Sequence, residues 1–484
     1  MIWCRQIWLK WGIVLNRSKL FWGLLSIILW CRLVLMVAVP LTDPSEARYA
    51  EIARVMAETH DWVTPWFASG IPFWGKPPAA FWGQALAMNI FGVSEFAVRL
   101  PALIASLITM LLLYGVARDL KGVVVARWSV LVYSSSMLPF IMAGIIMAPR
   151  SRRWFWRYGL FLGAAVGLLA KGPLVLVLAG GAVLPWLLFS KQGWPTLGAQ
   201  PWWSGTLLTL LITLPWYVAA EIKTPGFLYY FLVGEHFLRF VEPGWGGDLY
   251  GGAHDHPRGA IWLYYLVGAF PWVLWLGKGV RKLRFSLPRP MTLYFLGWAL
   301  STPVFFSLSG NILWTYVLPA LPAFSVLIAG LVTSQASSKS SVFWRAALPA
   351  IGPVVMVLLC VALLQMPEQI KSDKQLVEYV KQSSDQHEVA FVGEPTYSMR
   401  FYTQGAVTSI TAKELQKRVA SDGGETLPPY LAIPNRNRKS LPSRYKLVMS
   451  SKGVGLYQLQ YEQLALDEET PEPHGKGEIK ESVL

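Results

Sequence analysis

Acidic and basic side chains that could do chemistry stand next to apolar segments of this chain. The stretch LTDPSEARYAE, residues 41–51, holds Asp43, Glu46 and Arg48 directly after the apolar segment Leu20–Pro40. An ionisable group at membrane depth costs several kcal/mol, so it is a candidate functional group by default. A carboxylate can act as a general base, and an arginine can hold a phosphate. Acids and cations together therefore suit an anionic substrate that must lose a proton.

Five more ionisable groups are expected on the same side of a membrane: Lys76, Lys171, Glu235, His236 and Arg239. Lys171 lies in LLAKGPLVL and interrupts a long apolar run. The Gly-Pro after it predicts a helix break that faces a cavity, while a lysine that snorkels to the interface is the plainer alternative. Asp43 and Glu46, taken singly, could equally anchor a helix. A lipid-linked phosphosugar would suit the whole set, because its phosphate lies near the headgroups.

The composition predicts a chain that crosses a membrane many times. Of its 484 residues, 54% are hydrophobic and 15% are charged, whereas soluble domains are roughly 45–50% apolar and ~25% charged. Many apolar segments approach the ~20 residues that a span requires. The candidates are Leu20–Pro40, Pro101–Val116, Leu207–Ala220, Ala260–Leu276, Met291–Leu308, Trp314–Val332 and Ala346–Leu364. The first run is too long for a cleavable signal peptide.

The net charge of +15 does not indicate a nucleic-acid partner. Lysine and arginine concentrate in short segments beside the apolar runs, at residues 5–19, 118–127 and 278–289. The positive-inside rule places such short segments in the cytoplasm. The three cysteines, Cys4, Cys31 and Cys360, lie in or beside apolar segments and predict neither a disulfide framework nor a metal cluster.

These patterns divide the chain into four parts. Residues 1–19 are expected in the cytoplasm, and 20–364 form a transmembrane domain with external loops at 41–100 and 221–257. Residues 365–461 are expected to form a small soluble α/β domain on the periplasmic side. The acidic residues 462–484 are expected to be a disordered tail. The fold class is thus mostly α: a polytopic helical bundle with a small C-terminal α/β domain.

Local patterns place individual elements. Tyr49, Ile52, Ala53 and Met56 recur at helical spacing, which predicts an interfacial helix over Ala47–Thr59. A soluble helix is expected over 367–384. Short strands are expected in HEVAFVG, AVTSITA, PPYLAIP and YKLVMSS.

A metal site has little support in the sequence. His254 and His256, in the tripeptide HDH, could bind a metal, but one such tripeptide is a weak signal and a solvated loop is favoured. We therefore assign no metal ligand and no cofactor, and the question of a divalent metal stays open.

Longer stretches resemble a known family. DPSEARYAEIA, then DWVTPWF, then GKPPAAFWGQALAMNIFGVSEFAVRLPA resemble the bacterial lipid-carrier-dependent glycosyltransferases of the GT-C superfamily. These include the aminoarabinose transferases that modify lipid A, and they are related to protein O-mannosyltransferases. The resemblance continues through LLAKGP, EHFLRF, HPRGAIWLYYL and FFSLSGNILWTYVLPALP.

The resemblance implies roles for the residues above. Asp43 and Glu46 occupy the acidic motif of the family's first external loop, which is implicated in catalysis. Arg48, Lys76, His236 and Arg239 match positions that line the donor and phosphate site. Lys171 and Glu235 are added to this substrate-binding group because they are ionisable groups on the same side.

The implied protein is an inner-membrane glycosyltransferase with a periplasmic active site. It would pass a sugar from undecaprenyl phosphate to lipid A or another lipopolysaccharide component, by an inverting displacement. A protein O-glycosyltransferase with the same donor is the second enzyme hypothesis. A transporter or lipid flippase is disfavoured because the halves show no internal repeat. A non-catalytic or impaired relative remains an alternative.

Two departures from the family motivate that last alternative. In IIMAPRSRRWFW, residues 145–156, an apolar segment runs straight into arginines, and a family aspartate with about one ~20-residue span is missing after Ala148. Asn311 stands where the family often has lysine. Without that span, the chain either leaves the arginines on the external side of the membrane or folds back near Ser134–Pro139. Both arrangements are unfavourable, so we expect slow sugar transfer.

Overall fold

The computed structural model describes residues 18–68, 70–137, 154–242, 245–250, 256–279, 287–334, 339–383, 388–420, 427–435, 437 and 444–460. The chain forms two compact units. We call Met1–Val39 with Ile52–Gln365 the membrane unit, and Pro40–Glu51 with Met366–Leu484 the C-terminal unit. Each is described by itself. The N-terminal segment, the acidic tail, His254, the arginine cluster and the gap after Ala148 lie outside the described residues.

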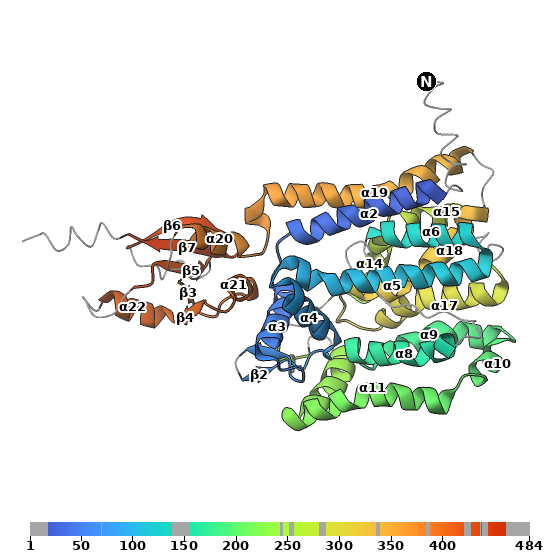
Figure 1. The fold of residues 1–484 in the computed structure, drawn as a ribbon, viewed down its shortest axis with the longest axis horizontal. Coiled ribbons are helices and arrows are strands. Elements are labelled where there is room, and N and C mark those ends of the chain that lie inside the picture. Colours follow the sequence, from blue (N-terminus) through green and yellow to red (C-terminus); the bar gives the residue numbers. More distant parts are fainter. Residues whose placement is uncertain are drawn as a thin grey trace, which may run out of the picture. The chain divides into compact units, whose positions relative to one another are not determined.

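Five helical segments of the described residues are long and apolar enough to cross a membrane (Figure 1). They are Phe21–Ala38, within α2 (Ser18–Ala38); α5 (Glu95–Lys121); α11 (Trp202–Lys223); Trp314–Ser334, a 3-10 turn followed by α18 (Leu321–Ser334); and Ala347–Gln365, within α19 (Lys339–Gln365). Each overlaps a span predicted from the sequence. Shorter apolar helices are α6 (Val123–Ser135), Tyr158–Lys171 within α8 (Trp154–Lys171), and α9 (Leu174–Phe189).

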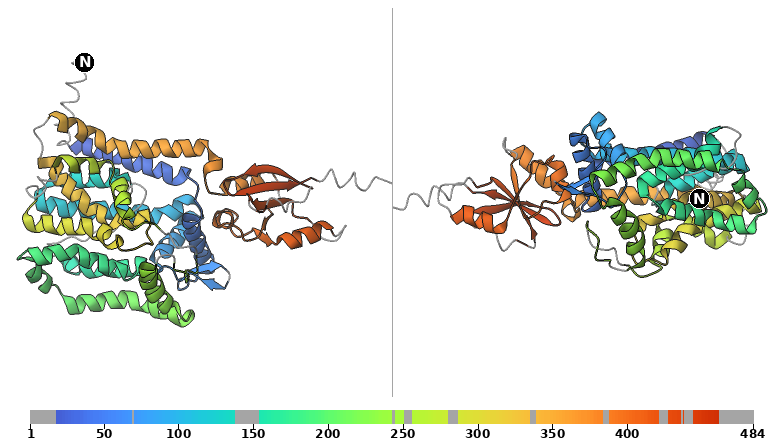
Figure 2. Two further views of the ribbon diagram at one scale, coloured as in Figure 1. Left: turned by 180° about the vertical axis from the view of Figure 1, so that it is seen from behind. Right: turned by 90° about the horizontal axis from the view of Figure 1, so that it is seen from below.

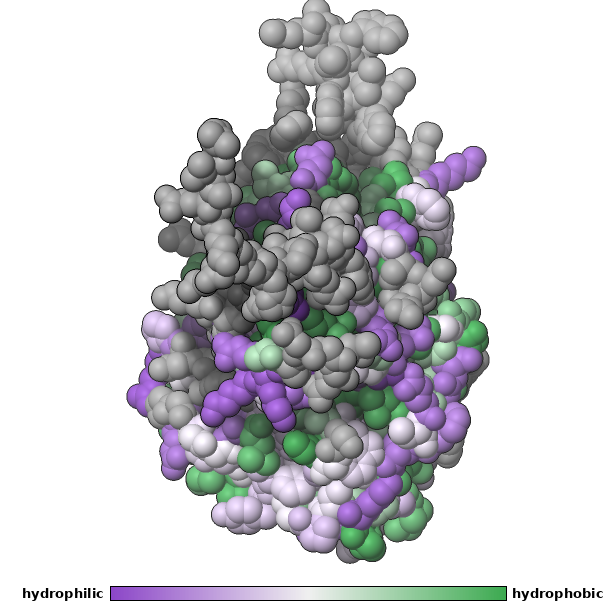
Figure 3. All heavy atoms as spheres, turned by 90° about the vertical axis from the view of Figure 1, so that its left-hand side faces the viewer, coloured by the Kyte–Doolittle hydropathy of each residue, from purple (hydrophilic) through white to green (hydrophobic). Residues whose placement is uncertain are grey.

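Apolar side chains on these spans face outward. Leu111 of α5 is 72% exposed and Leu211 of α11 is 65% exposed. Such apolar surfaces are unfavourable in water and favourable in lipid, because moving apolar surface out of water lowers the free energy of the protein. The chain is a polytopic membrane protein. By contrast, hydrophilic and hydrophobic side chains of the described residues are interspersed on the face drawn in Figure 3.

The predicted span Ala260–Leu276 is wrong as one continuous helix. Helix α14 (Ala260–Gly268) ends early, and a 3-10 turn (Trp272–Trp275) and the short α15 (Leu276–Gly279) follow. Pro271 lacks the amide hydrogen that an α-helix needs there, so the segment breaks. The predicted span Met291–Leu308 forms the continuous helix α17 (Arg289–Phe306).

The break predicted after Lys171 is confirmed. Helix α8 ends at Lys171 and α9 begins at Leu174, with Gly172 between them at φ +85°. A Cβ on Gly172 would lie 2.6 Å from the Phe231 ring and 2.9 Å from Nε2 of His236. Glycine is therefore required both by the backbone angle and by crowding.

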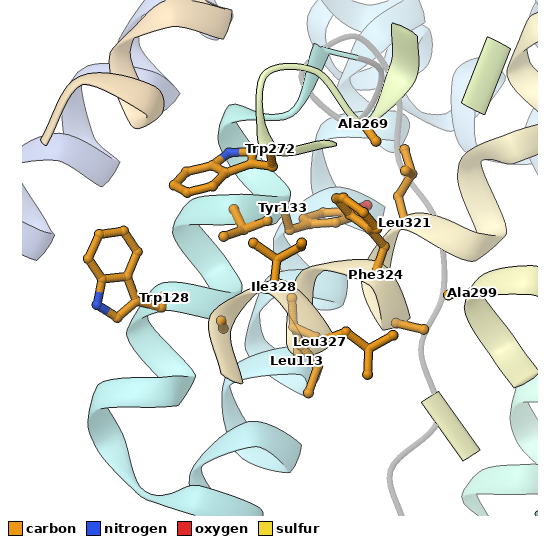
Figure 4. Packing of buried hydrophobic residues seen from close by; sticks show 14 of the residues in the cluster. Leu113, Trp128, Tyr133, Ala269, Trp272, Ala299, Leu321, Phe324, Leu327 and Ile328 are labelled. Carbon is orange, nitrogen blue, oxygen red and sulfur yellow. The ribbon is translucent and has the colours of Figure 1, made fainter. Parts of the chain in front are cut away.

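The core of the membrane unit lies among α5, α6 and α18 (Figure 4). Residues Leu321–Val332 of α18 are all buried. Tyr133 and Trp272 pack beside Phe324 in Figure 4, and the Trp272 indole donates to Oγ of Ser135 at 2.9 Å. This packing fixes α5, α6 and α18 against one another.

The segment between α2 and α5 has its own elements. Helix α3 (Ser45–Thr59) confirms the helix predicted over Ala47–Thr59. It is followed by an unpredicted hairpin of β1 (Trp66–Ala68) and β2 (Ile71–Pro72), and by α4 (Ala79–Phe91). The Asp61 carboxylate fixes the loop before the hairpin, since it accepts from the amides of Val63 and Thr64, from the Trp66 indole and from Lys223.

The described part of residues 221–257, a segment predicted to be an external loop, contains helix. It comprises α12 (Phe227–Tyr229), a π-helical segment (Tyr230–Leu238) and α13 (Arg239–Val241). π-helical turns occur frequently at functional sites.

The C-terminal unit is a five-stranded mixed sheet of order β4-β3-β5-β7-β6 with helices on both faces (Figure 2). The strands are β3 (Val389–Val392), β4 (Thr408–Ile410), β5 (Tyr430–Pro434), β6 (Tyr445–Ser450) and β7 (Val454–Leu459). Helices α20 (Lys374–Ser383) and α21 (Tyr397–Tyr402) contribute to one core, and α22 (Ala412–Ala420) to the other. The predicted α/β domain is confirmed, with four of its strands. β7 was missed, although the Lys-Gly turn before VGLYQL is a hairpin signal.

Candidate functional site

A cluster of cations and carboxylates, which we call the charged cluster, surrounds the end of α8. The ammonium of Lys171 lies 4.9 Å from the centre of the Tyr316 ring, a cation–π contact. Lys171 also interacts electrostatically with Lys76, Glu235 and Arg239. Four of the residues selected from the sequence are thus neighbours in space.

Arg239 is the best-held cation of the charged cluster. Its Nη1 donates to both carboxylate oxygens of Glu235, at 3.0 and 2.8 Å, and its Nη2 lies 3.3 Å from Asp248. The three side chains are 20%, 11% and 8% exposed. Burial lowers the pKa of Arg239, but the two carboxylates outweigh it, so the net pKa is raised. Arg239 therefore stays charged and fixed in orientation.

The tyrosines of the charged cluster connect segments that are distant in sequence. Tyr250 donates to the carbonyl oxygen of Pro72 at 2.7 Å and accepts from the Trp74 amide at 2.9 Å. This fixes the segment that leads from the hairpin to Lys76. Tyr230 donates to Glu235 at 3.2 Å and accepts from the Leu249 amide at 3.2 Å.

Both ring nitrogens of His236 lie against backbone carbonyl oxygens near the helix break after Lys171. Its Nδ1 lies 2.7 Å from the Phe231 carbonyl oxygen, and its Nε2 lies 3.2 Å from the carbonyl oxygen of Lys171. With Gly172 in contact with the same ring, His236 ties the π-helical segment to the end of α8. Its position relative to Lys171 is therefore fixed.

Asn311, one of the two departures, supports Arg239. Its Nδ2 donates to the carbonyl oxygens of Arg239, at 2.7 Å, and Glu242, at 3.3 Å. Its Oδ1 is buried and has no hydrogen-bond partner among the described residues. The asparagine therefore replaces a cation with a neutral group that fixes the backbone carrying Arg239.

Basic side chains outnumber carboxylates in the described part of the charged cluster. Among the described residues, its cations are Lys76, Lys171 and Arg239, and its carboxylates are Glu235 and Asp248. The sequence reasoning missed Asp248 and Tyr316. Asp248 could have been noticed, because it is an acid in the glycine-rich stretch GWGGDLYGG. Such a set can bind a phosphate, with Arg239 as a fixed donor and the lysines as point charges.

The other three predicted residues belong to the C-terminal unit. Asp43 accepts from the Ser398 amide at 3.1 Å and from the Ser398 hydroxyl. Glu46 accepts from the amide and hydroxyl of Thr42, at 3.1 and 3.3 Å. The Arg48 guanidinium lies 5.7 Å from the centre of the Tyr397 ring.

The protonation of Asp43 is set by its surroundings. Burial raises the pKa of Asp43 to about 6. Hydrogen bonds from Ser398 oppose the rise, the nearby Asp373 adds to it, and Lys371 opposes it. An acid of this kind can both take and give a proton near neutral pH.

The described residues contain no group of three or more His, Cys, Asp or Glu side chains that could hold a metal ion. His256 is described, and its amide donates to the Gly310 carbonyl oxygen at 3.0 Å.

Solved structures match almost the whole chain. ArnT from Cupriavidus metallidurans matches with TM-scores of 0.69 for the structure bound to undecaprenyl phosphate and 0.72 for the apo state. Both matches cover 91% of this chain and 98% of the other, at 18% and 16% identity. This chain has the ArnT fold. The expected GT-C architecture is confirmed.

Sequence comparisons agree with the resemblance to this superfamily. A family model described as dolichyl-phosphate-mannose-protein mannosyltransferase matches residues 75–149. The undecaprenyl phosphate-alpha-4-amino-4-deoxy-L-arabinose arabinosyl transferase of Edwardsiella ictaluri (strain 93-146) is 32% identical over 60% of this chain and 55% of the relative. The transferase of the same name from Yersinia pestis (strain Pestoides F) is 30% identical over 62% of this chain and 56% of the relative. The chain thus spans about half the length of the curated relatives it matches.

Proposed function

We propose that this chain is a glycosyltransferase of the bacterial inner membrane. It takes a sugar from an undecaprenyl-phosphate carrier and passes it to lipid A or another lipopolysaccharide component on the periplasmic side. The observation that carries the proposal is that Lys76, Lys171 and Arg239 gather around two carboxylates at the end of α8. The names of the arabinosyl transferases and the lipid carrier bound in one ArnT structure support the same donor.

In this proposal the charged cluster binds the donor phosphate. Arg239 is oriented by Glu235 and Asp248, so its remaining donors lose little conformational entropy when the phosphate binds. Lys76 and Lys171 repel each other, and an anion between them would relieve that repulsion. Binding would stabilise the negative charge that grows on the leaving phosphate during transfer.

The chemical step is an inverting displacement. An acceptor oxygen attacks the anomeric carbon, the bond from that carbon to the phosphate oxygen breaks, and polyprenyl phosphate leaves with the electron pair. The acceptor proton passes to a carboxylate. Asp43 and Glu46 remain the proposed groups for that role, as general base or as the group that orients the acceptor.

Donor binding is tested with Lys76→Gln and Lys171→Gln in the full chain. Each should weaken binding of undecaprenyl phosphate about 10- to 100-fold, since a hydrogen bond to a charged group contributes about 1.5–3 kcal/mol. Lys223→Gln is the matched control, because Lys223 pairs with Asp61 instead, at 2.6 Å. Equal binding by all three variants and the wild type would exclude the charged cluster as the phosphate site.

The acceptor is tested by mass spectrometry of lipid A from cells with and without the gene. The proposal expects a sugar adduct on lipid A or its attached core only when the gene is present. The family model that matches residues 75–149 favours protein as a second acceptor. A gene-dependent sugar found on protein, with unchanged lipopolysaccharide, would favour that alternative.

A further inference from the structure

The sequence places Asp43 just after the first membrane span, but the structure builds it into the C-terminal unit. The Leu41 amide donates to the Tyr402 hydroxyl at 2.8 Å, and the Asp43 amide donates to the Lys371 carbonyl oxygen at 2.8 Å. The Asp43 carboxylate accepts from Ser398. Residues more than three hundred positions later therefore fix the backbone and the side chain of this segment.

Ser398 is itself held rigidly. It is fully buried in α21, and its Oγ accepts from the Asp373 amide at 3.0 Å while it donates to Asp43. The Asp373 carboxylate accepts from Ser451 at 2.6 Å and from Thr396. Ser398 thus links the Asp373 backbone to the Asp43 carboxylate, which leaves Asp43 little freedom to change its orientation.

We propose that Ser398 and Asp373 are positioning residues that hold the Asp43 carboxylate in place and set its charge. Ser398 supplies the hydrogen bonds that favour the ionised form, and Asp373 supplies a nearby negative charge that disfavours it. The consequence for sugar transfer rests on the proposed role of Asp43. Ser398 and Asp373 then take part in the reaction through Asp43, without touching the reacting atoms.

The other charged or titratable groups around Asp43 act in known directions. Lys371 favours the ionised carboxylate. Tyr397, from α21, interacts with Asp43 and also with Arg48. None of these groups is altered in the two variants below, so the pH response reports Ser398 and Asp373 alone.

The two positioning residues should shift the titration of Asp43 in opposite directions. Ser398→Ala removes a donor to the ionised form, so the midpoint of the acidic limb of the transfer rate should rise by about one pH unit. Asp373→Asn removes a like charge, so the midpoint should fall. A merely structural role would lower the amount of active protein at every pH and leave the midpoint unchanged.

Ser409→Ala is the matched control, because it removes an exposed hydroxyl of the same unit that donates to the Gly393 carbonyl oxygen at 2.6 Å. Its midpoint should equal that of the wild type. Where Asp43→Asn abolishes transfer, midpoints of Ser398→Ala and Asp373→Asn that are unchanged, or that move in the same direction, would overturn the proposal.

A second measurement separates this proposal from the proposed function. An infrared titration of the full chain reports the Asp43 carboxyl directly, with Asp43→Asn used to assign its band. If Ser398→Ala and Asp373→Asn shift that titration in opposite directions, the positioning roles are supported. They are supported even if Asp43→Asn retains transfer, although retained transfer would reject Asp43 as the base. The opposite result is also informative. If Asp43→Asn loses transfer but neither Ser398→Ala nor Asp373→Asn shifts the infrared titration, Asp43 remains the proposed base and the positioning roles are rejected.

Discussion

The two units treat buried charge in opposite ways. In the membrane unit, Lys76, Lys171 and Arg239 outnumber Glu235 and Asp248 among the described residues, and an ion pair fixes Arg239. In the C-terminal unit, Asp43 accepts from Ser398 and Asp373 accepts from Thr396 and Ser451, and the charges of Asp373 and Lys371 act on Asp43 in opposite directions. A cluster of basic groups is stabilised by an added anion, whereas a buried carboxylate is stabilised by a proton. The first environment suits phosphate binding, and the second suits proton transfer.

The largest effect should come from removing the central cation of the membrane unit. Arg239→Gln leaves Glu235 and Asp248 mostly buried without it, so unfolding in detergent should become easier by on the order of 3 kcal/mol. Thermal unfolding measures this loss. Arg418→Gln, which breaks the exposed pair with Glu414, should cost less than about 0.5 kcal/mol. Similar losses in both variants would mean that burial does not distinguish the two ion pairs.

The geometry of the charged cluster should depend on Gly172. Gly172→Ala adds a Cβ at φ +85° that would meet the Phe231 ring at 2.6 Å, which should destabilise the protein by about 2 kcal/mol and weaken phosphate binding. Gly92→Ala has a similar φ of +78° and nothing within 4 Å of the new Cβ, so it isolates the backbone strain. Thermal unfolding and binding of undecaprenyl phosphate measure both effects. Equal losses in the two variants would mean that crowding against Phe231 adds nothing to the backbone strain.

The smallest effect should be the pH dependence that Asp43 gives to stability. Its pKa of about 6 in the folded protein exceeds the ordinary aspartate value of 3.8. Its stabilising contribution is therefore present below about pH 4 and lost as pH rises through 6. Relative to the wild type, Asp43→Asn should gain about 1–2 kcal/mol between pH 4 and pH 7, after a discount for partial exposure. Thermal unfolding of both proteins across that range tests this, and a difference that does not vary with pH would contradict the raised pKa.

Local sequence pattern determined most of the secondary structure. The apolar runs, the helix before Thr59 and four short strands follow from periodicity and length, which act within a few residues. The break after Lys171 follows from Gly172 and Pro173, since both residues act on their own backbone. The sequence pattern failed at two places. At 260–276 the apolar composition concealed the helix break at Pro271, and the strand β7 was not predicted.

The sequence also selected Lys76, Lys171, Glu235 and Arg239, because charge is rare beside apolar segments. Only the tertiary structure paired Arg239 with Asp248 and set Tyr316 under Lys171. It alone assigned Asp43 to the same unit as Ser398, which is 355 residues away. Hydrogen bonds and ion pairs act over a few ångströms of space at any separation along the chain, so no local pattern records them.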